Sequence, residues 1–227
     1  KRFTKKIPKC LIKFNNKPFI YYQLKYLKKN GINNVIISVG YKSDQIKSYV
    51  KNNINFINTK IIEDGKFFLG TGGATLKSLK YLKKYFFIIY GDSYLTFNFN
   101  SINSKNLATM VIFKNKNKFD RSNIQLGKKN KILYFNKKTK KKLDYIDYGL
   151  SYVSKKIFKT EKLKKKFDLS EFYAKISRKN KLNGLITKKR FYEIGSYNGI
   201  KEFKLYLKKL LILLTNFFLI YRSYLKI

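Results

Sequence analysis

The stretch PFIYYQLKYLKKNGINNVIISVG, residues 18–40, decides the fold class. In its first half, Phe19, Leu24 and Leu27 fall near a 3.6-residue spacing, which predicts an amphipathic helix that stops at Gly31. The second half, NVIISVG at 34–40, is a short apolar run rich in β-branched residues, which predicts a strand buried on both faces. A helix followed directly by a buried strand is the repeating unit of an α/β fold.

The same alternation continues downstream. The segment SDQIKSYVKN predicts a helix with Ser43 as its N-cap, and TKIIE at 59–63 predicts the next strand. A further helix is expected from Ala74 to about Tyr81, followed by the apolar strand FFIIY at 86–90. This order predicts a Rossmann-like mixed, mostly parallel sheet flanked by helices.

Beyond about residue 105 the pattern changes. The pieces ATMVIF, NIQL, KILYF and YIDYGLSYVS are strand-like and are joined by short polar turns. We therefore expect the sheet to become mixed or antiparallel in this part of the chain.

The chain has 227 residues, of which 44% are hydrophobic and 17% aromatic, so it can bury one large core. We find no long linker and no internal repeat. The expected organisation is one continuous domain over 1–205, followed by an apolar and basic C-terminal helix over 206–227.

The apolar run LLILLTNFFLIY at 210–221 belongs to that last helix. It is shorter than the roughly 20 residues that a membrane span requires, so no transmembrane span is expected. We expect the helix to pack on the body of the protein. An anchor on a membrane surface is the alternative, because basic residues flank the run: Lys208, Lys209, Arg222 and Lys226.

The charge balance is extreme, with 52 Lys and Arg against 12 Asp and Glu and a formal net charge of +40. Taken alone, this charge suggests a nucleic-acid partner, and a polyanion-binding protein is kept as an alternative. However, arginine favours recognition of phosphates and base edges, and nearly all of these cations are lysine. Lys, Asn, Ile, Phe and Tyr are all abundant, which indicates a compositional bias toward A/T-rich codons. We expect no nucleic-acid partner.

Two residue types are scarce. The chain has no histidine and a single cysteine, Cys10, so it offers no imidazole base or ligand and no intrachain disulfide. This composition favours a reducing, cytoplasmic setting.

A glycine-rich segment, FLGTGGATLKSL at 68–79, follows the second predicted strand. Gly70, Gly72 and Gly73 permit close approach of a ligand to the backbone, and the N–H groups of the helix behind them favour an anion. The segment matches neither a Walker loop nor G-x-G-x-x-G. A nucleotide loop and a plain glycine-rich turn both remain open at this point.

Asp92 follows the strand at 86–90, and ligands of open α/β sheets bind beyond the carboxyl ends of the strands. A carboxylate there is a natural Mg²⁺ ligand, although it could equally cap a turn. Glu193, in FYEIGS at 191–196, offers a second carboxylate for the metal. The alternative is that Glu193 is an ordinary half-exposed residue of a strand.

Four blocks taken together resemble the sugar-phosphate nucleotidyltransferases, or NDP-sugar pyrophosphorylases. They are the segment at 7–50 that begins IPKCLIKF, then FLGTGGATLKSL, then FFIIYGDSYL, and finally YIDYGLSYVSKKIF with FYEIGSYNGIKEF. The resemblance covers about residues 5 to 205. The glycine segment and the FDR at 119–121 look closest to the D-glycero-D-manno-heptose 1-phosphate guanylyltransferase branch.

The resemblance implies a fold of the nucleotide-diphospho-sugar transferase type and a reaction between an NTP, with GTP expected, and a sugar 1-phosphate. The products are an NDP-sugar for surface glycan synthesis and pyrophosphate. The attacking phosphate oxygen is already an anion, so the reaction needs no general base. It needs alignment and charge neutralisation by Mg²⁺ and lysines.

The resemblance also implies roles for individual residues. Lys9 matches a lysine that contacts the phosphates, Asp92 matches the first metal ligand, and Glu193 stands where the second, usually an aspartate, is expected. One group matches the nucleotide-binding loop: Gly70, Thr71, Gly72 and Gly73.

The sugar-phosphate site is implied in the same way. Lys138 matches a second phosphate-contacting lysine, and Gly149 matches a close approach of backbone to the sugar, with Asp147 and Tyr148 beside it. Lys137 stands where a sugar-binding glutamate is expected, which departs from the family pattern.

The largest departure is at the start of the chain. In the family a buried strand and a G-G-x-G-T-R-L loop come just before the segment that here begins at Lys1. We therefore expect a fragment or a decayed gene product that is unstable and inactive as it stands. A truncated or degenerate, non-catalytic domain that binds nucleotide or sugar phosphate is the alternative function, and the oligomeric state is left open.

Overall fold

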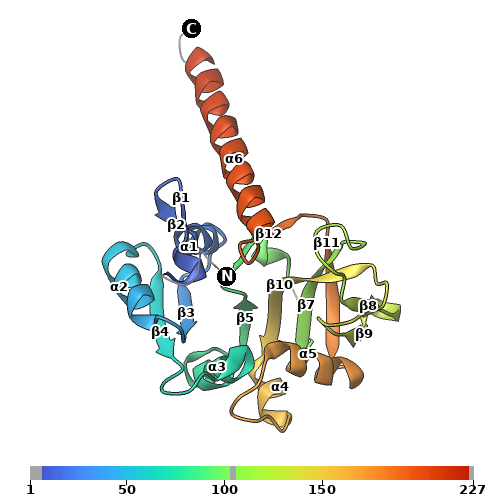
Figure 1. Ribbon diagram of the computed structural model, residues 1–227. Coiled ribbons are helices and arrows are strands. Elements are labelled where there is room, and N and C mark those ends of the chain that lie inside the picture. The colour runs from blue at the N-terminus through green and yellow to red at the C-terminus, as the bar shows by residue number, and fades with distance from the viewer. Residues whose placement is uncertain (1–6, 103–105, 225–227) are drawn as a thin grey trace.

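The computed structural model describes residues 7–102 and 106–224, with side chains described as far as Leu213. The helices are α1 (Phe19–Lys29), α2 (Ser43–Asn53), α3 (Gly70–Ser78), α4 (Lys155–Thr160), α5 (Leu169–Arg178) and α6 (Tyr197–Tyr224). The strands are β1 (Lys13–Phe14), β2 (Lys17–Pro18), β3 (Asn34–Val39), β4 (Asn58–Glu63), β5 (Tyr85–Ile89), β6 (Ser93–Leu95), β7 (Ala108–Lys114), β8 (Ile124–Leu126), β9 (Ile132–Phe135), β10 (Tyr145–Ser154), β11 (Leu182–Thr187) and β12 (Phe191–Glu193). Figure 1 shows their arrangement.

The largest sheet has the strand order β11-β7-β10-β8-β9, and β5 also pairs with β10. Because β10 is antiparallel to both β5 and β7, and β11 is parallel to β7, strands β5, β7 and β11 run in one direction. The predicted mixed α/β sheet is confirmed, including its change of character after residue 105. The register of β10 on β7 shifts between Asp147 and Ser151, where Gly149 has φ +85°.

Strands β3 and β4 form a separate parallel pair. Within the described ranges, β3 pairs only with β4 and β5 pairs only with β10. Figure 1 shows β3 on the side of β5 that is away from β10, and Ile37 of β3 and Ile89 of β5 pack into the same core cluster. One edge of each strand is therefore unpaired in the part of the chain that the structure describes.

The prediction that the strand at 34–40 is buried on both faces is wrong. Val35, Ile36 and Ile37 are only half-buried. A strand side chain is normally shielded by neighbours on both adjoining strands, and among the residues described here β3 has a neighbouring strand on one side only.

Helix α1 agrees with its prediction. Phe19, Ile20, Leu24 and Leu27 are buried, and Gly31 follows with φ +80°. Phe19 meets the ring of Phe203 edge-on at 5.0 Å between centroids, which joins α1 to the start of α6.

Two helix starts differ from the prediction. Ser43 is the first residue of α2 rather than its N-cap, because the chain enters the helix through Lys42 at φ 53° and the Ser43 hydroxyl donates to Glu63 Oε2 at 2.9 Å. The helix expected from Ala74 to about Tyr81 begins at Gly70 and ends at Ser78, followed by a 3₁₀ turn (Leu79–Tyr81). The glycine segment is thus the first turn of α3 and not a loop.

Helix α6 is continuous from Tyr197 to Tyr224, so the expected boundary between 205 and 206 falls inside it. Its first turns pack on the body through Phe203 and Leu207, whereas Leu213 is exposed and Figure 1 shows the rest of the helix leaving the body. The expected packing therefore holds only for the first turns. None of the helices in the described ranges combines the length and apolar composition that crossing a membrane requires. Lys226 lies outside the described residues.

Candidate active site

Three residues singled out by the sequence meet at one point. Pairing of β12 with β6 sets Glu193 opposite Ser93, and the Ile194 N–H donates to the Asp92 carbonyl at 2.9 Å. Lys9 Nζ lies 3.7 Å from Asp92 Oδ2. A Cβ placed on Gly195 would lie 2.8 Å from Glu193 Oε2, 3.5 Å from Asp92 Oδ2 and 3.6 Å from Lys9 Nζ. Lys9, Asp92 and Glu193 thus surround a single spot.

This spot is open to solvent. The side chains of Lys9 and Asp92 are 47% and 40% exposed, so a charged ligand can reach both. Cys10 follows Lys9 in the same 3₁₀ turn, and burial raises the pKa of its thiol to about 11. The thiol therefore stays protonated near neutral pH and is not an active nucleophile.

The loop that carries Asp92 is held by Gln23 of α1. Gln23 Nε2 donates to the Tyr90 carbonyl at 3.2 Å and to the Ser93 carbonyl at 2.7 Å. These bonds fix the backbone on both sides of Asp92. Sequence reasoning missed Gln23, although an amide within the otherwise apolar and basic stretch FIYYQLKYL was a usable signal.

Glu193 already has partners within its own turn. Its carboxylate accepts the N–H of Gly195, the N–H of Ser196 and the Ser196 hydroxyl. These bonds pin the turn that leads into α6. Each carboxylate oxygen has two lone pairs, so capacity for a further ligand remains.

The donor set fits a hard divalent cation. Mg²⁺ in proteins takes one or two carboxylates and completes its shell with water and phosphate oxygens. Asp92 and Glu193 each place a carboxylate oxygen within 3.5 Å of the point that a Cβ on Gly195 would occupy, and the half-exposed side chain of Asp92 leaves room for the other ligands.

The glycines of the 70–73 segment serve close packing. A Cβ on Gly70, which has φ +74°, would lie 2.5 Å from the Phe167 carbonyl oxygen, and one on Gly72 would lie 2.1 Å from the Phe167 ring. The N–H groups of Gly72 and Gly73 donate to the Phe167 carbonyl at 3.0 and 3.3 Å. These two N–H groups are therefore engaged by the chain itself, and Phe167 occupies the space beside the glycines that the sequence suggested for a ligand.

Thr71 is the exposed member of the segment and connects it to α5. Its hydroxyl donates to Asp168 Oδ2 at 2.9 Å and accepts the Leu169 N–H at 2.9 Å. Burial opposes ionisation of Asp168, but hydrogen bonds from Ser170 and Thr71 outweigh it and hold the pKa of Asp168 below its usual value. Sequence reasoning missed Asp168, whose only signal was its position as the N-cap of α5.

Asp147, on β10, is buried. Its Oδ1 accepts the Gly149 N–H at 2.9 Å and its Oδ2 accepts the Tyr90 hydroxyl at 3.0 Å. Lys137 Nζ lies 3.8 Å from Asp147 Oδ2 and 4.1 Å from the centroid of the Tyr90 ring. Burial raises the pKa of Asp147, and the charge of Lys137 only partly offsets this effect.

The other three residues expected at the sugar site, Tyr148, Gly149 and Lys138, are not all buried to the same extent. Tyr148 is fully buried and its hydroxyl accepts the Thr96 N–H at 3.2 Å, so its side chain is not available to a sugar. The reason is strand alternation, since Tyr148 follows Asp147 on β10 and points to the other face. A Cβ on Gly149 would lie 3.0 Å from Ser93 Oγ, so this position requires glycine both for space and for its positive φ. Lys138 is exposed.

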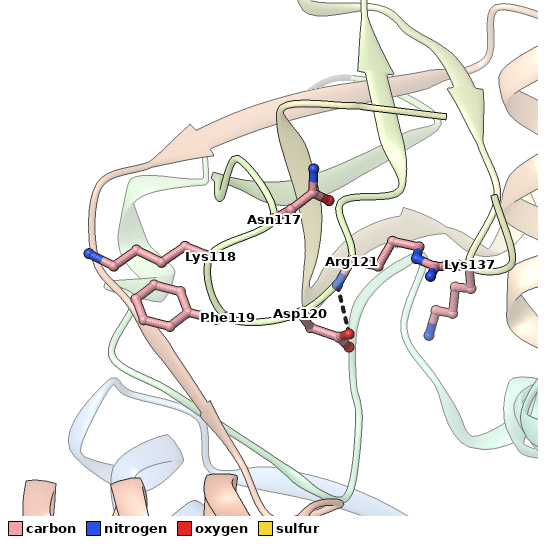
Figure 2. Close-up of a pocket in the computed structure, with 6 residues that line it drawn as sticks. All are labelled: Asn117, Lys118, Phe119, Asp120, Arg121 and Lys137. Carbon is pink, nitrogen blue, oxygen red and sulfur yellow. Dashed lines mark hydrogen bonds between the residues drawn. The ribbon is translucent and has the colours of Figure 1, made fainter. Parts of the chain in front are cut away.

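Lys137 borders two pockets. One, of about 570 Å³, is lined by the loop at 117–121 together with Lys137, and Figure 2 shows the side chains of Arg121 and Lys137 near one another on one side of it. The other, of about 750 Å³, lies between β9 and α5 and is also lined by Lys138 and Asp168. The FDR segment noted in the sequence therefore belongs to the wall of the first pocket.

Some of the predicted residues are linked to one another, whereas Tyr148, Gly72 and Gly73 are buried in the chain itself. One group is Lys9 with Asp92, and the other is Tyr90, Lys137 and Asp147, in which both Lys137 and Tyr90 lie within electrostatic reach of Asp168, the partner of Thr71. Both groups combine ammonium groups, which can neutralise phosphate oxygens, with carboxylates, which can hold a cation.

Comparison with known proteins gives consistent matches. The profile of the nucleotidyl transferase family matches residues 2–202. The chain is 33% identical over 142 residues to a D-glycero-alpha-D-manno-heptose 1-phosphate guanylyltransferase of Campylobacter jejuni subsp. jejuni serotype O:2, which covers 61% of this chain and 62% of the relative. It is 30% identical over 139 residues to the protein of the same name from Aneurinibacillus thermoaerophilus, covering 58% and 59%. The match thus spans about six tenths of the length of each of these two curated relatives.

Solved structures show the same fold. HddC from Yersinia pseudotuberculosis superposes with a TM-score of 0.76 at 22% identity, covering 88% of this chain and 90% of that one. The same protein complexed with GMP-PN gives a TM-score of 0.74 at 23% identity, covering 86% and 88%.

Proposed function

The chain belongs to the nucleotidyl transferase family, and from that premise we propose that it joins a nucleotide to a sugar 1-phosphate, with GTP and a heptose 1-phosphate as the substrates. A phosphate oxygen of the sugar 1-phosphate attacks the α-phosphorus of the NTP. The bond from that phosphorus to the bridging oxygen of the β-phosphate breaks, and pyrophosphate leaves with the electron pair. The product is an NDP-sugar for glycan synthesis, made in the cytoplasm.

The observation that carries this proposal is the meeting of Lys9, Asp92 and Glu193 around Gly195. The lysine would neutralise phosphate charge, and the two carboxylates would hold Mg²⁺. The ion, when bound, supplies charge neutralisation at the reacting phosphates. The nucleophile is already ionised, which agrees with a chain that has no histidine to act as a base.

The nucleotide and the sugar are proposed from similarity and from the site. GTP is favoured by the two guanylyltransferase relatives and by the similar structure of HddC complexed with GMP-PN. The sugar phosphate is assigned to the region of Lys137, Lys138, Asp147 and Gly149, next to the pocket at 117–121.

The test is pyrophosphate release. The chain is assayed as it stands and with a strand and a G-G-x-G-T-R-L loop added before Lys1, using each common NTP with heptose or mannose 1-phosphate. We expect Mg²⁺-dependent release with GTP that requires the sugar phosphate. No release from either folded protein with any pair of substrates would contradict the proposal.

A second candidate is a domain that binds nucleotide without turnover. It is favoured by the local bonds that already engage Glu193, the second proposed metal ligand. Calorimetry separates the two candidates, because heat of GTP binding without pyrophosphate release supports the second.

A further inference from the structure

Helix α6 extends well beyond the part that packs on the body. At 1.5 Å per residue, its 28 residues span about 42 Å. Phe203 and Leu207 are buried in a core cluster that also contains Phe14 and Phe19, and among the side chains described, which end at Leu213, Leu210 is the last that packs against it. Figure 1 shows the remainder of α6 projecting away from all other elements.

The projecting part is apolar on more than one face. Leu211, Ile212 and Leu213 are 52%, 49% and 66% exposed. Consecutive helical residues are about 100° apart, so these three alone cover more than half of the circumference. The sequence continues as LTNFFLIY from 214 to 221. A helix that is apolar all round is normally surrounded by a protein core or by lipid, and not by water.

The apolar run is too short to cross a bilayer. Residues 210–221 would span about 18 Å of helix, against a hydrocarbon core of about 30 Å. A lipid environment for this segment is therefore one bilayer surface, with the helix lying among the head groups and upper acyl chains.

Charge decides between lipid and a second copy of the chain. The exposed residues Lys204, Lys208 and Lys209 precede the apolar run on the same helix, and the whole chain carries a formal charge of +40. Parallel pairing of two copies of α6 would bring these lysines together, and any pairing would bring two chains of formal charge +40 into contact, where like charges repel. An anionic lipid surface attracts them instead, at about 1 kcal/mol per basic residue. We propose that the projecting part of α6 docks the protein on an anionic membrane surface.

The test is sedimentation with vesicles at physiological salt. The full chain is mixed with vesicles of phosphatidylcholine alone, or with about a third phosphatidylglycerol in the manner of an anionic leaflet. We expect binding to the anionic vesicles and little to the neutral ones. The triple variant Leu211→Ser, Ile212→Ser, Leu213→Ser should bind at least about tenfold more weakly, because three large apolar side chains no longer enter the lipid.

A matched control keeps the net charge and removes exposed apolar groups elsewhere. Leu133 and Ile186 are 47% and 43% exposed on other elements, and the variant Leu133→Ser, Ile186→Ser should bind like the parent chain. Equal binding by the triple variant would overturn the proposal, because the net charge alone would then account for it. Absence of binding by the parent chain would overturn it too. So would a dimer by light scattering that the triple variant converts to a monomer, since a second copy would then cover the helix.

Discussion

The ammonium of Lys137 lies 3.8 Å from the buried carboxylate of Asp147. The family pattern expects a glutamate at the first of these positions, so here a cation faces the site in place of an anion. The lysine suits its surroundings, because a carboxylate that is 3% exposed requires a nearby positive charge or a proton.

Replacing Lys137 by Met should destabilise the fold. The buried Asp147 loses its compensating charge, and we expect a cost of about 1 to 2 kcal/mol once solvent screening of the half-exposed lysine is allowed for. Urea unfolding measures this loss. Adding Asp147→Asn should restore most of it, because the amide oxygen still accepts from Gly149 or Tyr90 and no charge remains to be compensated. Additive effects of the two substitutions would show that the pair does not interact.

Replacing Asp92 by Asn should abolish Mg²⁺-dependent pyrophosphate release in the protein that carries the added strand and G-G-x-G-T-R-L loop. The side chain is 40% exposed, and the bond from Ile194 goes to the backbone carbonyl of Asp92, which the substitution keeps. We therefore expect the melting temperature in thermal unfolding to be the same as that of the parent. Asp44→Asn is the matched control, since Asp44 is also a surface aspartate paired with a lysine, Lys47, but lies on α2 away from the site. Activity of Asp92→Asn equal to that of the control would refute the metal assignment.

Replacing Gly72 by Ala should destabilise the protein by about 1 to 3 kcal/mol, the usual cost of overpacking. The added methyl would lie 2.1 Å from the Phe167 ring, so the ring or the start of α3 must move. Chemical unfolding measures the effect. Gly91→Ala is the comparison, because a Cβ there meets nothing within 4 Å. Equal stability of the two variants would mean that the 70–73 segment is not a packing element.

The sequence predicted what local patterns control. The apolar spacing at 19–29 and the strand-like piece YIDYGLSYVS at 145–154 predicted α1 and β10, and the residues after each strand pointed to Asp92 and the glycine segment. Contacts between distant segments were not predictable in the same way. The bond of Thr71 to Asp168 joins residues 97 positions apart, and the role of the glycines depends on Phe167, which no local pattern connects to them. Ser43 failed as a cap for the same reason, because Glu63 on the neighbouring strand binds its hydroxyl.

Glu161 should make the stability of the protein depend on acid pH. Its fully buried carboxylate forms ion pairs with Lys179, whose Nζ lies 2.7 Å from Oε2, and with Lys181, whose Nζ lies 2.9 Å from Oε1. Burial alone would raise its pKa, but these two partners outweigh it and lower the pKa of Glu161 to about 2. In the unfolded chain the pKa is near 4.5, so the folded state gains stability above that pH and loses it as pH falls toward 2.

The expected outcome is a difference in pH profile between parent and variant. Glu161→Gln should be less stable than the parent by roughly 2 to 3 kcal/mol near neutral pH. This difference should shrink as pH falls from about 5 to about 2, because the parent then loses the same charge by protonation. Denaturant unfolding at a series of pH values measures both quantities. A parallel shift of the Glu161→Gln curve at every pH would show that the lysines do not stabilise the carboxylate.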